Sequence, residues 1–175
     1  MIADAVCAVQ DKEFFLDSSK TPARLKLFAE SGAWDLKVIN LHRDGRGVSN
    51  STRKHLGVSM REASRIWAND AEEIRQLTQQ LRDVPIVTIR YEDLCCDPEE
   101  VLATITDEFG LDRMDLKPGA LKEGHHHILG NNMRLNSVSE IRFDETWRNE
   151  LSEQELQDFE AAAGDVNKVL GYAAP

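Results

Sequence analysis

The amino-acid sequence predicts an α/β protein in which a parallel sheet is flanked by helices. Short apolar segments alternate with segments whose apolar residues recur at helical spacing, as expected for this class. The apolar segments are nearly continuous, which is typical of strands buried on both faces of a parallel sheet. The chain of 175 residues is long enough for one core, and we expect residues 1–175 to form a single domain.

The N-terminal part predicts two helices with a strand between them. Residues 2–10 have helical apolar spacing, and Phe14-Phe15-Leu16 is a short apolar run that predicts a strand. A helix should begin at Pro22, because proline is favoured at the first helical position and Thr21 can cap the helix. Gly32 is the expected end of that helix.

The next segment predicts a strand that turns sharply into a helix. Residues 37–42 form the strand, which breaks at Asp44-Gly45, and a helix is expected from about Gly47. The capping box Ser59-Met60-Arg61-Glu62 then begins a long amphipathic helix. Its predicted core face consists of Ala63, Ile66, Trp67, Ile74, Leu77 and Leu81.

The C-terminal half continues the alternation. Residues 85–91 predict a third strand, and Asp97-Pro98-Glu99-Glu100 predicts the start of a helix that ends at Gly110. Residues 111–140 have no clean period, which is typical of a functional or irregular segment. A second capping box, Ser152-Glu153-Gln154-Glu155, begins the last predicted helix.

Polar residues follow each of the three predicted strands, as Asp17 to Lys20, Arg43 to Arg46 and Tyr91 to Asp93. Ligands of parallel sheets bind at the carboxyl ends of the strands, so these residues predict one polar site. Arg43, with Ser49 and Ser51 in the following helix, suits a phosphate. We also expect free backbone N–H groups at the start of that helix to contribute.

The charge distribution limits the ligands that the protein can bind. The net charge of −10 argues against general affinity for nucleic acid or anionic membranes. Between His42 and Lys54 the sign is reversed, with four basic residues against Asp44 alone. The four are Arg43, Arg46, Arg53 and Lys54. An anionic ligand is therefore expected at this segment.

The cysteines and the histidine run predict neither a disulfide framework nor a metal site. Cys7, Cys95 and Cys96 are odd in number and contain no Cys-x-x-Cys motif, so we expect reduced thiols and a cytoplasmic location. Three successive side chains, His125 to His127, cannot readily converge on one ion, and we expect no metal. No apolar run approaches the ~20 residues that span a bilayer.

Four sequence blocks together carry a resemblance to a known family. They are Asp17 to Pro22, Arg43 to Arg46 with Ser51 eight residues after Arg43, Tyr91 to Leu94, and His127 to Arg134. On these blocks, which run in the family's order along almost the whole chain, the sequence resembles the sulfotransferase superfamily. The stretch from Trp147 to Tyr172 resembles the end of carbohydrate-type and bacterial members. These enzymes transfer a sulfuryl group from 3'-phosphoadenosine 5'-phosphosulfate (PAPS).

The resemblance implies roles for particular residues. Arg43 and Ser51 match the motif that holds the 3'-phosphate of PAPS, and Arg46 belongs to the same block. Lys20 matches a lysine that stabilises charge on the bridging oxygen, and Tyr91 falls near the adenine. The residues that resemble a late loop closing over the donor are His127, Asn131 and Arg134. Three residues are candidates for the general base, Asp17, Glu92 and Asp93. Each could equally cap a turn or pair with an arginine.

One feature of the family is missing from the sequence. The loop that holds the 5'-phosphosulfate has no counterpart, and no Gly-x-x-x-x-Gly-Lys-Ser/Thr motif occurs. We therefore expect a P-loop NTPase-like sulfotransferase fold without its first strand and phosphate loop, either as the C-terminal portion of a longer enzyme or as a shortened family member. Unpaired sheet edges would then favour self-association.

The function implied by the resemblance is sulfuryl transfer from PAPS to a hydroxyl or amine of a small-molecule or carbohydrate acceptor. The alternative is a non-catalytic remnant that binds 3'-phosphoadenosine nucleotides or a protein partner. A relative of nucleotide kinases is disfavoured, because the phosphate loop and a magnesium-binding set are absent from the sequence. No nucleic-acid or membrane partner is expected.

Overall fold

The computed structural model of the protein describes residues 2–113 and 143–172. The chain clusters into two compact units, Met1–Asp35 and Leu36–Pro175, and each is described by itself. None of the helices in the described ranges combines the length and apolar character that a membrane-spanning helix requires.

The first unit contains helices α1 (Ile2–Gln10) and α2 (Pro22–Ser31), and both were predicted. Gly32 ends α2 in the left-handed conformation with φ of 59°, as expected. The strand predicted at Phe14-Phe15-Leu16 is wrong, because these residues lie outside any strand and their side chains are 52%, 47% and 79% exposed. A run of three apolar residues has no periodicity, so composition could not distinguish a strand from an extended connection.

The second unit contains a parallel pair of strands, β1 (Val38–His42) and β2 (Ile86–Arg90). The register runs from Val38 opposite Ile86 to His42 opposite Arg90, so the two strands end side by side. The fold class predicted from the sequence, a parallel sheet flanked by helices, is confirmed for this pair. The carboxyl ends of β1 and β2 meet at one edge, where Arg43 and Tyr91 begin the segments that follow.

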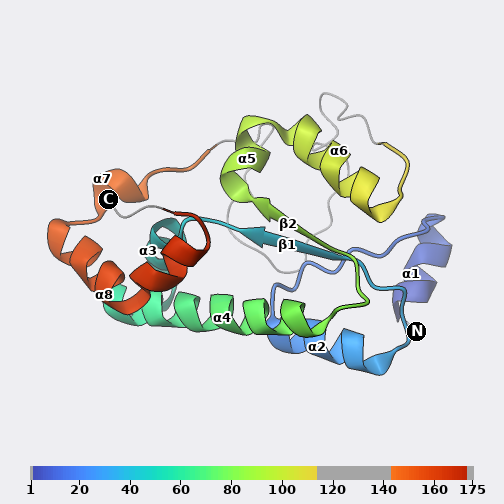
Figure 1. Ribbon diagram of the computed structural model, residues 1–175, viewed down its shortest axis with the longest axis horizontal. Helices are drawn as coiled ribbons and strands as arrows, with labels where there is room; N and C mark the ends of the chain where they lie inside the picture. The colour runs from blue at the N-terminus through green and yellow to red at the C-terminus, as the bar shows by residue number, and fades with distance from the viewer. Residues whose placement is uncertain (1, 114–142, 173–175) are drawn as a thin grey trace. The chain divides into compact units, whose positions relative to one another are not determined.

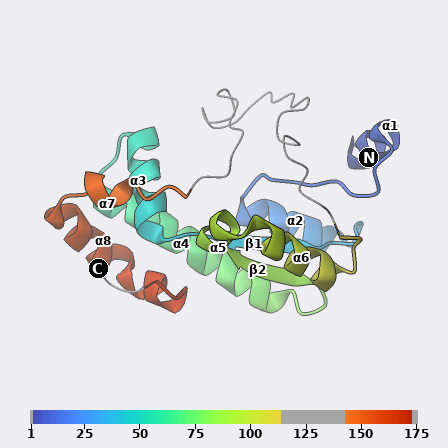
Figure 2. The same cartoon turned by 90° about the horizontal axis from the view of Figure 1, so that it is seen from above.

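Four helices pack together around the beginning of the longest one, α4. They are α3 (Gly45–Leu56), α4 (Met60–Gln80), α7 (Trp147–Glu150) and α8 (Glu153–Val169). Figures 1 and 2 show α3, α7 and α8 gathered at the N-terminal end of α4. Their shared core consists of Met60, Trp67, Ala68, Trp147, Leu151, Phe159 and Ala163. Ile66, predicted to face this core, is 37% exposed instead.

Local capping signals fix where these helices begin. The Ser59 hydroxyl accepts a hydrogen bond from the Glu62 N–H (3.2 Å), and Ser152 with Glu155 forms a complete reciprocal capping box. The sequence placed the start of α3 near Gly47, whereas the helix begins at Gly45 because Asp44 caps it. The four-residue helix α7 was not predicted, since one helical turn leaves no periodic signal.

The segment after β2 forms two helices on one side of the sheet. α5 (Tyr91–Cys96) was not predicted, and α6 (Pro98–Phe109) was. Asp97 caps α6 by accepting a hydrogen bond from the Glu100 N–H (3.1 Å), and Gly110 ends it with φ of 62°. The side chains that join α6 to β2 are Val87, Ile89, Val101 and Ile105. Figure 1 shows α6 and α4 on opposite sides of the strands.

Candidate functional site

The turn between β1 and α3 is the centre of the candidate site. The expectation of free backbone N–H groups at this helix start is wrong, because four successive amides already donate hydrogen bonds within the protein. The Asp44 N–H donates to Glu92 Oε1 (3.2 Å), the Gly45 N–H to Asn167 Oδ1 (2.9 Å), the Arg46 N–H to Asp44 Oδ1 (3.0 Å) and the Gly47 N–H to the Asp44 carbonyl (3.0 Å). An anion at this turn would therefore be bound by side chains.

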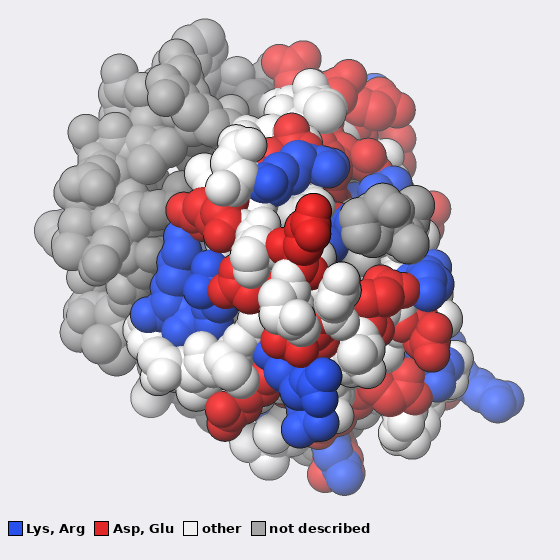
Figure 3. Space-filling view, turned by 90° about the vertical axis from the view of Figure 1, so that its left-hand side faces the viewer, with Lys and Arg blue, Asp and Glu red and all other residues white. Residues whose placement is uncertain are grey.

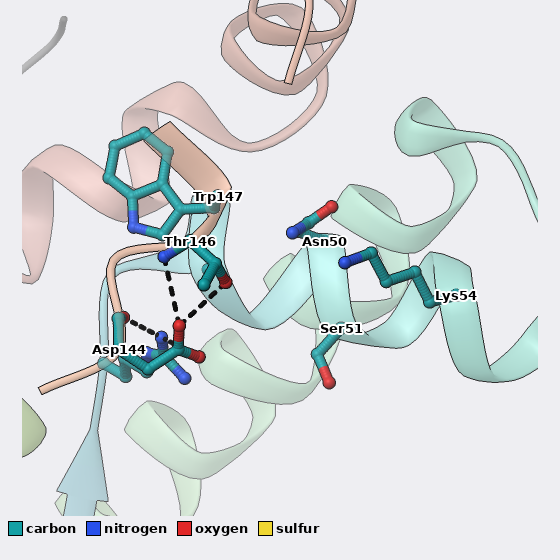
Figure 4. A pocket seen from close by; sticks show the side chains of 8 residues that line it. Asn50, Ser51, Lys54, Asp144, Thr146 and Trp147 are labelled. Carbon is teal, nitrogen blue, oxygen red and sulfur yellow. Dashed lines mark hydrogen bonds and ion pairs between the residues drawn. The ribbon is translucent and has the colours of Figure 1, made fainter. Parts of the chain in front are cut away.

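A cavity of about 110 Å³ lies beside this turn. It is lined by Arg43, Gly47, Asn50, Ser51, Lys54, Asp144, Thr146 and Trp147. In Figure 4, Asn50, Ser51 and Lys54 project from α3 on one side, with Asp144, Thr146 and Trp147 on the other. Arg43 and Ser51, which the sequence analysis paired, thus line the same cavity.

The guanidinium of Arg43 is held by three groups. Its Nη2 donates hydrogen bonds to the backbone carbonyl of Asp144 and to Asp144 Oδ2 (3.1 Å). It also lies over the Tyr91 ring, with 4.5 Å between the guanidinium carbon and the ring centroid. The Tyr91 hydroxyl in turn accepts a hydrogen bond from the Asp144 N–H (3.2 Å). Tyr91 is therefore a third predicted site residue that the fold brings to this place.

Asp144 is the acidic residue of the cavity. Its Oδ1 accepts hydrogen bonds from the Thr146 N–H (3.0 Å) and hydroxyl (2.7 Å), while its Oδ2 pairs with Arg43. Partial burial acts to raise the pKa of the Asp144 carboxyl, but the Thr146 and Arg43 hydrogen bonds and the Arg43 charge outweigh it and lower the pKa. The carboxylate is consequently ionised near neutral pH.

The positive segment predicted from the sequence is neutralised in the fold. Each of its four basic residues pairs with a carboxylate, and three of the four partners come from residues 144–155. The pairs are Arg43 with Asp144 (3.1 Å), Arg46 with Asp44 (2.6 Å), Arg53 with Glu155 (3.1 Å) and Lys54 with Glu150 (2.5 Å). Figure 3 shows basic and acidic side chains interspersed over this end of the molecule, which carries α7 and α8. An anion therefore meets a site whose cations are already paired.

Arg46 is buried in the turn and does not line the cavity. It is 6% exposed, and its guanidinium makes three hydrogen bonds to the Asp44 carboxylate at 2.6 to 3.1 Å. The guanidinium also lies over the Trp147 ring, 4.5 Å from its centroid. These contacts engage Arg46 inside the protein, so we leave it out of the proposed ligand site.

Glu92, a candidate base, belongs to a network behind the turn that the sequence did not indicate. The Tyr172 hydroxyl donates to Glu92 Oε2 (2.7 Å), and Arg90 lies over the Tyr172 ring (4.7 Å to its centroid). Burial, together with the hydrogen bond to Glu92, raises the pKa of Tyr172. Since the other Glu92 oxygen accepts the Asp44 N–H, this carboxylate supports the turn that carries Arg43.

Asp17 and Lys20 lie in the first unit, in the segment that leads into α2. Asp17 accepts a hydrogen bond from the Ser19 N–H (2.8 Å) and pairs with Arg24 (2.8 Å). Slight burial acts to raise the pKa of Asp17, but the Ser19 hydrogen bonds and Arg24 outweigh it and lower the pKa. Lys20 has a φ of 61°, in the left-handed region that residues other than glycine rarely adopt.

The other predicted loop residues, His127, Asn131 and Arg134, lie outside the described residues. Sequence reasoning missed several cavity residues. Asn50 and Lys54 could have been found, because they follow Gly47 at helical spacing on the side that also carries Ser51. Asp144 could not have been found, because no pattern in the sequence around it indicates a site residue. In the described ranges, no three His, Cys, Asp or Glu side chains are grouped as metal ligands.

Comparison with known proteins identifies the relationship. The model of the sulfotransferase family matches residues 33–115, which include β1, Arg43, Ser51, β2 and Tyr91. No curated protein sequence matches the chain. The structure is similar to that of the sulfotransferase domain from the curacin biosynthetic pathway, with a TM-score of 0.54 and 21% sequence identity. That match covers 89% of this chain and 60% of the other, so this chain spans less than two thirds of that domain. Residues 33–115 therefore match the sulfotransferase family in sequence, and the chain shares the fold of a sulfotransferase domain.

Proposed function

We propose that this protein is a sulfotransferase that transfers a sulfuryl group from PAPS to a hydroxyl or amine of a small-molecule or carbohydrate acceptor. The observation that carries the proposal is that Arg43 and Ser51 line one cavity at the carboxyl end of β1, within the segment that matches the family. In this proposal the cavity receives the 3'-phosphate of the donor.

The residues present fit a phosphate group. The Arg43 guanidinium offers a planar set of donors, the exposed Ser51 adds a hydroxyl, and Lys54 adds a second positive charge. The Thr146 hydroxyl lies on the opposite wall. The adjacent Tyr91 ring, already under Arg43, provides an aromatic surface beside the same group.

Lys20 is the proposed catalytic residue, on the resemblance of residues 17–22 to the family. PAPS provides the sulfuryl group, and the Lys20 ammonium is proposed to neutralise the charge that develops on the bridging oxygen. Asp17 is paired with Arg24 and its pKa is lowered, which makes it a weak proton acceptor. We therefore assign Asp17 to holding the segment that carries Lys20, through Ser19 and Arg24, and not to proton abstraction.

A second candidate function is binding of 3'-phosphoadenosine nucleotides without transfer. The observation that favours it is that the cavity lined by Arg43 and Ser51 is all that this function requires. The two functions share the Arg43 cavity and differ in turnover. Binding of nucleotide without release of 3'-phosphoadenosine 5'-phosphate (PAP) from PAPS would favour this second candidate.

The first experiment measures PAP binding by calorimetry. We expect the wild type to bind PAP more tightly than adenosine 5'-phosphate, which lacks the 3'-phosphate. Arg43→Ala should weaken PAP binding by about 10- to 100-fold, because a hydrogen-bonded charge pair is lost. Arg75→Ala is the matched control, since Arg75 pairs with Glu72 on the surface of α4. Failure of the wild type to bind PAP would overturn the proposal.

The second experiment tests Lys20 by the variant Lys20→Asn. Asparagine tolerates the left-handed backbone at this position, so the variant removes the charge without new strain. We expect PAP release from PAPS, assayed with a mixture of phenolic, alcoholic and amine acceptors, to fall by about 10²- to 10³-fold. PAP binding should change little. The exposed Lys12→Asn is the control, and an unchanged rate in Lys20→Asn would exclude the assigned role.

A further inference from the structure

We propose that Asp144 is an internal competitor for the anion that Arg43 binds, so that ligand binding exchanges a carboxylate for a phosphate on the same guanidinium. This inference rests on the proposed function. It follows from the position of Asp144, which lines the cavity together with Ser51 and accepts a hydrogen bond from Arg43. A 3'-phosphate needs the same donor group.

The exposure of the pair makes the exchange feasible. The Arg43 side chain is 21% exposed and the Asp144 side chain is 45% exposed, so the carboxylate can turn into water when it is displaced. A partly exposed pair of this kind is weak. A phosphate carries more charge than a carboxylate and offers more acceptor oxygens, which favours it on a planar guanidinium.

The second cation of the cavity is neutralised in the same way. Lys54 pairs with Glu150 Oε2, which also accepts a hydrogen bond from the Asn50 amide (2.7 Å). Asp144 lies three residues before α7 and Glu150 is the last residue of α7, so the same short segment supplies both carboxylates. The two cations of the cavity are therefore balanced by two carboxylates, and removal of the Asp144 charge would leave the cavity positive.

The two oxygens of Asp144 have separate partners, which permits a precise variant. Oδ1 accepts both hydrogen bonds from Thr146 and holds the turn before α7, while Oδ2 pairs with Arg43. In Asp144→Asn, the remaining carbonyl oxygen can keep the Thr146 contacts. The new amide NH₂ cannot accept a hydrogen bond from Arg43, so the competing interaction is removed.

The test compares PAP affinity by calorimetry in full-length variants. We expect Asp144→Asn to bind PAP about 1.5-fold to fivefold more tightly than the wild type, the range given by the strength of a partly exposed ion pair. Glu145→Gln is the matched control, because it removes one negative charge from the adjacent residue, whose carboxylate pairs with Arg148. Its PAP affinity should stay near that of the wild type.

The outcomes separate this inference from the function on which it rests. PAP binding by the wild type with no gain in Asp144→Asn over Glu145→Gln would overturn the competition and leave the proposed function standing. No PAP binding by any variant would overturn both. Near-ultraviolet circular dichroism checks the fold, and Asp144→Ser, whose hydroxyl can accept the Thr146 N–H bond, should give the same gain if Asp144→Asn misfolds.

Discussion

Replacing Asp44 by alanine is expected to lower the free energy of unfolding by about 3 to 5 kcal/mol, the range for breaking a buried ion pair by removing one partner. The side chains of Arg46 and Asp44 are 7% and 10% exposed, and their closest contact is 2.6 Å. Without the carboxylate, the Arg46 guanidinium would remain buried with its charge uncompensated. The variant also loses the cap of α3, since Asp44 Oδ1 accepts the Arg46 N–H.

The variant Asp97→Ala separates the capping contribution from the ion pair. Asp97 has the same role at the start of α6, where it accepts the Glu100 N–H, but it is exposed and neutralises no buried cation. Its loss should cost about 0.5 to 2 kcal/mol. Urea denaturation of both variants measures the difference. A loss in Asp44→Ala no larger than that in Asp97→Ala would show that the buried pair contributes nothing.

A double variant tests the origin of the effect. Asp44→Asn keeps an acceptor for the Arg46 N–H, and Arg46→Met removes the buried charge while retaining an apolar side chain against Trp147. The two changes together should cost less than the sum of the single changes, because neither leaves an unpaired charge when both are present. Additive losses would indicate that the two side chains are energetically independent.

The parts of the fold that depend on local chemistry could be predicted from the sequence. Ser59, Asp97 and Ser152 each accept a hydrogen bond from the N–H three residues later, and Gly110 ends α6 with a positive φ. Each signal lies within one helical turn of the feature it determines. The strands β1 and β2 were recognised for a related reason, since a continuous apolar run indicates burial on both faces.

The partners of the site residues could not be predicted, because they are distant in the sequence. Asp144 lies 101 residues from Arg43, and Asn167 lies 122 residues from Gly45, whose N–H it accepts. The chain contains 31 acidic residues, and nothing in the sequence distinguishes the one that pairs with Arg43. The excess of positive charge between His42 and Lys54 was for this reason mistaken for a positive surface, whereas the fold supplies a carboxylate to each cation.

The burial of Arg46 could not be predicted either, because one of its partners, Trp147, is distant in the sequence. Its place in a family block suggested a ligand contact, but two residues of separation across a tight turn bring it onto Asp44. Burial then depends on α7, which places the Trp147 ring against the guanidinium. The sequence pattern made Arg46 a candidate for ligand binding, but its packing against Asp44 and Trp147 buries its side chain. Arg43, which directly follows β1, stays at the edge of the sheet whatever packs behind it.

Gly45→Ala is the second variant with a large expected effect on stability. A Cβ atom at residue 45 would lie 2.4 Å from two ring carbons of Trp67, whose side chain is buried in the core of the second unit. Neither the indole ring nor the start of α3 can move away easily, because the Gly45 N–H is hydrogen-bonded to the buried Asn167. We expect the free energy of unfolding to fall by about 1 to 3 kcal/mol, as for other overpacked cores.

Gly164→Ala in α8 is the matched control. A Cβ atom there would lie 2.5 Å from the end of the Glu160 side chain, which is 36% exposed and can rotate away. The gain in helix propensity on replacing glycine, up to about 1 kcal/mol, should then dominate and stabilise the protein. Gly45 is the first residue of α3, where the propensity gain is smaller than in a helix interior, so the difference between the two variants in urea denaturation sets an upper limit on the clash with Trp67. Trp67→Phe in the Gly45→Ala background should recover part of the loss, because the smaller ring leaves room for the methyl group. If Gly45→Ala proves as stable as Gly164→Ala, the close approach of Trp67 to the turn after Arg43 is not a packing constraint.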